Sequence, residues 1–143
     1  MEKTGSCLCG AVKYTIKDAK PEAGACHCGM CRKWSGGVFF AVEAQPDTVT
    51  LEGQDSLTRF ASSDWGERGF CSACGSSLFF RITAPGPHHG VYHFGFGTFD
   101  DQSGVEMAGE IFIDRKPDTY SFAGNAPRMT EAEFLALYAP PAD

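Results

Sequence analysis

The chain has no long hydrophobic segment and no excess of basic residues. Its apolar runs, such as Val38 to Val42, are far too short to cross a bilayer. Residues 1–6 lack the apolar core of a secretory signal, so we expect a cytoplasmic protein that has no membrane partner. Twelve Lys and Arg against 18 Asp and Glu give a formal net charge of −6. This charge repels phosphate backbones and argues against general nucleic-acid binding.

Familiar catalytic patterns are missing as well. The sequence shows no Ser-His-Asp order, no glycine-rich phosphate loop and no paired carboxylates. Its 143 residues are enough for one domain with a real core, and we expect a single domain over residues 1–143. Seventeen glycines and 12 phenylalanines favour a turn-rich β protein.

Hydrophobic alternation predicts strands along most of the chain. Val12, Tyr14 and Ile16 share one side of a half-buried strand over residues 10–16. Further strands are expected at 38–42, 48–51, 57–61, 77–82, 91–99 and 107–113. Thr130 and Glu133 form a capping box, which predicts a helix from Glu131 to Tyr138. The expected fold class is therefore mainly β, with several antiparallel strands and a short C-terminal helix.

All seven cysteines lie in short clusters. The patterns are C-x-C, C-x-C-x-x-C and C-x-x-C, formed by Cys7 and Cys9, by Cys26, Cys28 and Cys31, and by Cys71 and Cys74. In a reducing compartment, such clusters bind metals or undergo redox chemistry more often than they form disulfides, and an odd number also resists complete pairing. Soft thiolates at this spacing are typical zinc ligands.

Spacing suggests how the thiols divide between two ions. In an extended segment, residues i and i+2 project to one side, so Cys26 and Cys28 can grip one ion while His27 points away. Cys31 would reach back across a tight turn at Gly29 and Met30 and complete a local group of three. Cys7 and Cys9 can likewise bind one ion, with Leu8 pointing away.

The remaining cysteines then form a group of four, Cys7, Cys9, Cys71 and Cys74. Closed four-cysteine zinc sites are structural, whereas three protein ligands plus an exchangeable position are the pattern of a catalytic zinc. An open zinc lowers the pKa of an incoming thiol and holds it as thiolate at neutral pH. Beside an electrophilic carbonyl, that thiolate can form or break a carbon–sulfur bond.

The sequence leaves several alternatives open. The group of four is also compatible with a redox pair or with buried small side chains. A histidine could close the group of three: His27 is a poor candidate because of its direction, but His88, His89 and His93 are possible. Arg32 and Lys33 either bind the carboxylates of an acidic thiol or form a solvated basic pair. Iron is disfavoured because a three-thiol group does not supply its usual four cysteines.

Three segments resemble the motifs of the glutathione-dependent formaldehyde-activating (GFA) family, whose domain is shared with centromere protein V. They are Gly5-Ser6-Cys7-Leu8-Cys9-Gly10-Ala11-Val12-Lys13-Tyr14, Cys26-His27-Cys28-Gly29-Met30-Cys31-Arg32-Lys33-Trp34-Ser35-Gly36 and Arg68-Gly69-Phe70-Cys71-Ser72-Ala73-Cys74-Gly75. The match in order and placement extends over roughly residues 5–82. Beyond it, Arg115-Lys116-Pro117-Asp118 keeps the proline but lacks the tryptophan of a stretch found in many members.

The resemblance implies a β-tent-like fold with two zincs per chain, one structural and one catalytic. It assigns the structural zinc to Cys7, Cys9, Cys71 and Cys74, and the catalytic zinc to Cys26, Cys28 and Cys31, in agreement with the spacing. The implied reaction is that of a carbon–sulfur lyase, S-(hydroxymethyl)glutathione synthesis from glutathione and formaldehyde. The expected partners are therefore a glutathione-like thiol and a small aldehyde, with Arg32 helping to anchor the substrate. The alternative is a non-catalytic two-zinc domain with a structural or protein-binding role.

Overall fold

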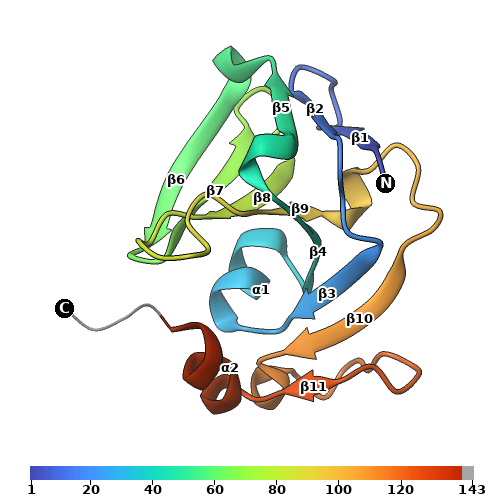
Figure 1. Ribbon diagram of the computed structural model, residues 1–143, viewed down its shortest axis with the longest axis vertical. Helices are drawn as coiled ribbons and strands as arrows, with labels where there is room; N and C mark the ends of the chain where they lie inside the picture. Colours follow the sequence, from blue (N-terminus) through green and yellow to red (C-terminus); the bar gives the residue numbers. More distant parts are fainter. Residues whose placement is uncertain (140–143) are drawn as a thin grey trace.

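The structure, a computed structural model, describes residues 1–139 and consists mainly of β-strands (Figure 1). The strands are β1 (Lys3–Ser6), β2 (Lys13–Ile16), β3 (Glu22–Cys26), β4 (Phe39–Ala44), β5 (Val49–Glu52), β6 (Leu57–Ser63), β7 (Gly66–Cys71), β8 (Ser77–Ile82), β9 (Tyr92–Gly95), β10 (Glu106–Ile111) and β11 (Arg128–Met129). The helices are α1 (Gly29–Ser35) and α2 (Glu131–Tyr138). The predicted fold class is confirmed.

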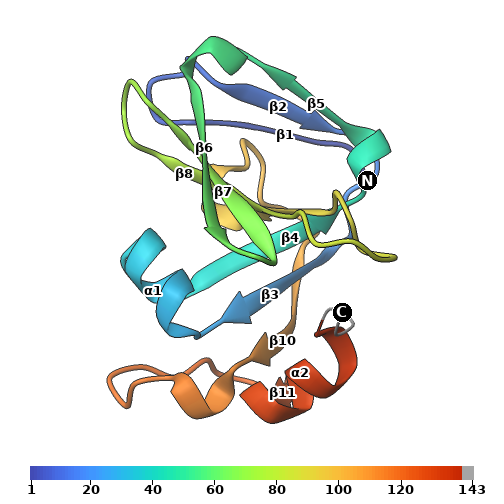
Figure 2. The same ribbon diagram turned by 90° about the vertical axis from the view of Figure 1, so that its left-hand side faces the viewer.

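The strands form two sheets. One has the order β1-β2-β5, and the other has the order β11-β10-β3-β4-β9-β8-β7-β6. All neighbours are antiparallel except β3 with β10 and β10 with β11, which are parallel, so the larger sheet is mixed rather than purely antiparallel. In the two views, the smaller sheet lies beside β6–β8, while β3, β10 and β11 lie at the opposite end and α1 occupies the space between (Figures 1 and 2).

The main core lies where the smaller sheet meets the larger one. Val12, Tyr14 and Ile16 are almost fully buried, as the alternation predicted, although β2 begins only at Lys13. The ring of Tyr14 stacks on that of Phe94 with centroids 4.1 Å apart, and Phe79 meets Phe94 edge-on at 5.5 Å. These aromatic contacts hold β2 against β8 and β9.

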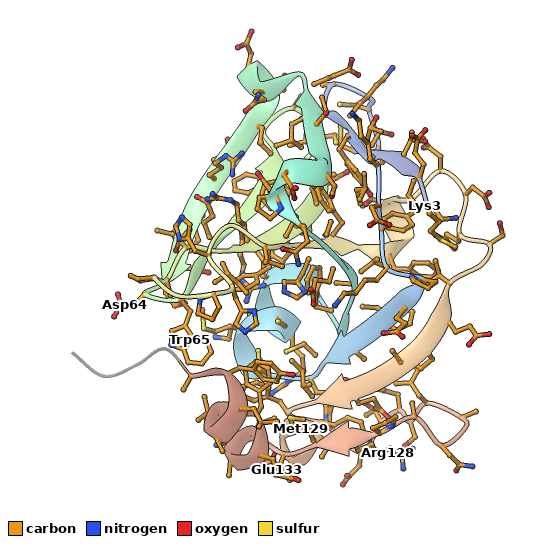
Figure 3. The ribbon with its side chains drawn as sticks, in the orientation of Figure 1. Lys3, Asp64, Trp65, Arg128, Met129 and Glu133 are labelled. Carbon is orange, nitrogen blue, oxygen red and sulfur yellow. The ribbon has the colours of Figure 1, made fainter. Side chains whose placement is uncertain are left out.

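Helix α2 has the predicted bounds and the predicted capping box. The Thr130 hydroxyl accepts from the backbone N–H of Glu133, and the Glu133 carboxylate accepts from the N–H of Thr130. Phe134 of this helix packs on Trp65, which lies in the β6–β7 turn, with ring centroids 6.2 Å apart (Figure 3). Within residues 1–139, no helix combines the length and apolar character needed to span a membrane.

Helix α1 was not predicted. The spacing suggested an extended segment followed by a tight turn at Gly29 and Met30, but a helix begins at Gly29 and runs through Trp34 to Ser35. Its N-cap is Cys28, a residue type that carries little capping signal in a sequence, and its Sγ accepts from the N–H of Cys31 at 3.4 Å. Gly36 ends the helix in the left-handed conformation with φ of 82°.

Candidate metal centres

Four cysteines from two distant parts of the chain meet beside the smaller sheet. Cys7 and Cys9 come from the turn after β1, Cys71 ends β7, and Cys74 lies in the β7–β8 turn. Their sulfur atoms all lie within 4.8 Å of one another. The sulfurs of Cys7 and Cys9 are 3.6 Å apart, and those of Cys9 and Cys71 are 3.8 Å apart. We call these residues the four-cysteine cluster.

Tight turns bring these thiols close together. The spacing argument places Cys7 and Cys9 in an extended segment, but in the structure they flank a turn. The Cys7 carbonyl accepts from Gly10 N–H at 3.1 Å, and the chain turns back so that Val12 N–H donates to the Cys7 sulfur at 3.3 Å. Leu8 still points away and is 90% exposed. Gly75 closes the second turn at φ of 79°, a left-handed backbone conformation that favours glycine.

The second group, which we call the three-cysteine cluster, is local in sequence. Cys26 ends β3, Cys28 caps α1 and Cys31 lies in its first turn, and their sulfurs also lie within 4.8 Å of one another. The first turn of α1, rather than an isolated reverse turn, therefore returns Cys31 to the other two thiols. Hydrogen bonds from Cys26 and then Cys31 lower the pKa of Cys28 far below its usual range, whereas the neighbouring thiols raise the pKa of Cys26, and the pKa of Cys31 is also raised. A negative charge at neutral pH is thus favoured on Cys28 among the three thiols.

No other ligand type joins the three-cysteine cluster within residues 1–139. Histidine, aspartate and glutamate side chains are all absent from the group of mutually close donor atoms. His88 and His89 are exposed in the loop between β8 and β9, where His88 contacts the ring of Tyr138. His93 lies on β9, where its cross-strand partners are Glu43 on β4 and Phe80 on β8, and burial lowers its pKa. The structure therefore presents three ligands, not four.

His27 lies between two cysteines of this cluster but belongs to a separate buried network. Its ring is fully buried and turned away from the thiols, as alternation predicted. Nε2 lies 2.8 Å from a carboxylate oxygen of Glu110, and Nδ1 lies 2.8 Å from the Tyr120 hydroxyl. Arg128 donates to the second Glu110 oxygen at 2.9 Å. Because Glu110 lies on β10 and Arg128 on β11, the network ties the loop before α1 to these two strands.

Burial alone would raise the pKa of Glu110. The hydrogen bonds from Arg128 and His27 outweigh this and hold the pKa below its usual range. A carboxyl whose pKa is lower in the folded state contributes stability above its ordinary pKa of about 4.3. That contribution is lost as the pH falls through the folded value.

Replacing Glu110 with glutamine removes this charge while keeping the shape. We expect the free energy of unfolding at pH 7 to fall by about 2 kcal/mol, because two charge-assisted hydrogen bonds are weakened. Urea unfolding at pH 7 and at about pH 3 measures the effect, and the gap between wild type and variant should narrow at the lower pH. Glu106→Gln, an exposed change on the same strand, is the control. Equal stability of the Glu110 variant and wild type at pH 7 would contradict the network's role.

Two basic residues near the cluster were singled out from the sequence. The Nε of Arg32 donates to the His27 carbonyl at 2.9 Å, so part of its guanidinium helps to hold the loop. Lys33 is exposed. A surface cavity of about 230 Å³ adjoins the buried network and is lined by Glu110, Ile113, Lys116, Ser121, Phe122 and Arg128.

Sequence reasoning missed Arg68. This residue lies on β7, and one of its terminal nitrogens, Nη2, lies 3.6 Å from the Cys31 sulfur. Only 4% of the residue is exposed. Its sequence signal is a charged residue in the stretch Arg68-Gly69-Phe70 that leads into a cysteine pair, and the sequence does not predict the strand that this stretch forms.

Comparisons with known proteins cover the part of the chain that carries both clusters. The family model described as glutathione-dependent formaldehyde-activating enzyme matches residues 2–115, a range that contains both clusters. An "Uncharacterized lyase" of Schizosaccharomyces pombe is 30% identical over 134 residues, covering 94% of this chain and 95% of the relative. A protein of Halomonas elongata named "Putative glutathione-dependent formaldehyde-activating enzyme" is 29% identical over 122 residues, covering 80% of this chain and 76% of the relative.

Proposed function

The chain belongs to the glutathione-dependent formaldehyde-activating enzyme family, and from this premise we propose that it is a zinc-dependent carbon–sulfur lyase. It would form or break the adduct of a small thiol and a small aldehyde, such as S-(hydroxymethyl)glutathione. One observation carries the proposal: Cys26, Cys28 and Cys31 form a group of three ligands with no fourth among residues 1–139.

Both clusters fit zinc in the nature and spacing of their donor atoms. All seven cysteines are free thiols. Zn–S bonds of about 2.3 Å place the sulfurs of a tetrahedral site about 3.8 Å apart. The sulfur separations of 3.6 and 3.8 Å within the four-cysteine cluster match this value. We propose that this cluster holds a structural zinc and that the three-cysteine cluster holds the catalytic one.

Zinc bound to the three-cysteine cluster would supply an open position and lower the pKa of a thiol that binds there. The chain's own residues shape the rest of the site. Phe39 and Ala41 are buried beside the cysteines, and Trp34 and Phe80 pack on them, which limits access of water. The His27 network holds the loop that carries the ligands, and we propose that Arg32 binds a carboxylate of the thiol substrate.

The reaction balances without an oxidant or reductant. A new bond forms between the thiol sulfur and the carbonyl carbon of the aldehyde. The carbonyl π bond breaks, and the proton lost by the thiol ends on the former carbonyl oxygen. The reverse reaction releases the same two partners. A low-dielectric surrounding strengthens the electrostatic terms that favour this transfer.

The rival function is a non-catalytic two-zinc domain, which requires the second zinc to be fully ligated by protein. Zinc content per chain, measured before and after dialysis against a mild chelator with and without glutathione, separates the two. We expect two zincs, of which one is labile and is protected by glutathione. Two inert zincs that are indifferent to thiol would overturn the enzyme proposal and favour the rival.

A further inference from the structure

Arg68 carries a buried charge that the proposed reaction has not yet used. Two of its nitrogens, Nε and Nη1, are shielded from solvent and find no hydrogen-bond partner among residues 1–139. Burying a charge is costly unless it is paired, and natural proteins rarely leave buried N–H groups unsatisfied. Such a group therefore needs a counter-charge close by.

No carboxylate within residues 1–139 forms an ion pair with Arg68. Its sequence neighbour Glu67 pairs instead with Arg59 at 2.8 Å and Arg81 at 3.1 Å. The nearest anion-forming atom with which Arg68 makes a polar contact is the Cys31 sulfur, 3.6 Å from Nη2. The polar partner of the Arg68 side chain within residues 1–139 is therefore a thiol of the three-cysteine cluster.

Two aromatic rings fix the guanidinium in this position. Its central carbon lies 5.1 Å from the ring centroid of Trp34 on α1 and 5.1 Å from that of Phe80 on β8. Phe80 is the cross-strand partner of Arg68, so the β7–β8 register places one of the two rings. A planar guanidinium suits stacking on rings, whereas an ammonium group presents a compact point charge.

We propose that Arg68 is a positioning residue that balances the charge of the three-cysteine cluster and makes it select an anionic fourth ligand, a thiolate, over a neutral one. Three thiolates around a divalent ion carry a net charge of −1, and a fourth thiolate brings it to −2. The fixed charge of Arg68 offsets this second charge in a poorly solvated site. The inference rests on the proposed function, because it concerns the open position of the same cluster.

The test compares an anionic ligand with a neutral one. Co²⁺ replaces the labile zinc, and absorbance changes report binding of 2-mercaptoethanol, which lacks carboxylates, and of imidazole. Arg68→Met should weaken thiol binding about tenfold or more, as expected for loss of a unit charge at contact distance in a partly shielded site. Imidazole binding should change less than about twofold, since a neutral ligand adds no charge.

Two further variants sharpen the experiment. Arg59→Met is the matched control. Arg59 also lies over an aromatic ring, 5.3 Å from the centroid of Phe79, but its charge is paired with Glu67. The Arg59→Met protein should therefore bind both ligands as wild type does. Arg68→Lys keeps the charge and should retain most of the preference for thiol over imidazole. This variant keeps the proposal testable if Arg68→Met does not fold, because loss of the preference with the charge retained would contradict it.

The possible outcomes distinguish failure of the charge-balancing role of Arg68 from failure of the proposed lyase function. Unchanged thiol binding in Arg68→Met overturns the charge-balancing role. Equal losses for thiol and imidazole also overturn it and indicate a purely structural role. If the wild-type cobalt protein responds to neither ligand, the open position itself is absent, and both the proposed function and this inference fail.

Discussion

Replacing Cys28 with serine is expected to reduce turnover to the rate of the reaction without enzyme and to release about one zinc per chain, while the fold survives. The reason lies in the two roles of this residue. Its sulfur is one of three donors in the three-cysteine cluster, and the same atom caps α1 by accepting from Cys31 N–H. A serine hydroxyl is a good helix cap but, unlike a thiolate, a poor zinc ligand. The substitution should therefore separate the capping role from the metal-binding role.

Three measurements check this expectation on the purified variant: zinc per chain, thiol-dependent consumption of aldehyde, and the far-ultraviolet circular dichroism spectrum. Met30→Ser is a matched control in the same turn, since Met30 is 45% exposed and offers no ligand in the cluster. It should retain both zincs and full activity. An unfolded Cys28→Ser protein, or one that still holds two zincs, would contradict the assignment of Cys28.

The sequence was most informative where the relevant contacts are local. Cys26, Cys28 and Cys31 fall within six residues, so spacing alone restricts how far apart their sulfurs can lie. The same holds for the capping box of α2 and for the alternation that buries Tyr14. The bridging of the two distant cysteine pairs followed from ligand arithmetic, because neither pair alone completes a tetrahedral site.

Contacts that depend on sheet register could not be read from the chain. His27 meets Glu110 across 83 residues because β3 pairs with β10 in parallel, an arrangement that we did not expect. Arg68 reaches Cys31 across 37 residues because β7 lies next to β8 and faces α1. Helix α1 was missed because its seven residues are too few to show a helical period.

Replacing Cys71 with serine is expected to have the opposite outcome to the Cys28 change, namely loss of the fold. Cys71 is fully buried at the end of β7, and its sulfur lies 3.8 Å from that of Cys9, 62 residues away in sequence. A zinc held by these thiols would close that long loop and join the smaller sheet to the β7–β8 hairpin. Serine would also leave a buried hydroxyl without the ligand bond.

Binding of a structural zinc contributes directly to folding free energy, on the order of 10 kcal/mol in small zinc domains, which matches or exceeds the net stability of many domains. Cys71→Ser should therefore be largely unfolded or insoluble at 25 °C, and thermal unfolding and circular dichroism would show it. Ser72→Ala, an exposed change in the same turn, controls for disturbance of the turn. Its free energy of unfolding should fall by less than about 1 kcal/mol, because the change removes only the hydrogen bond from the Ser72 hydroxyl to the Ser56 carbonyl. A folded Cys71→Ser protein that retains the activity of wild type would show that the four-cysteine cluster does not hold the fold together. The geometry of the three-cysteine cluster would then depend on the hydrogen bonds around His27 and on the packing of Arg68 between Trp34 and Phe80.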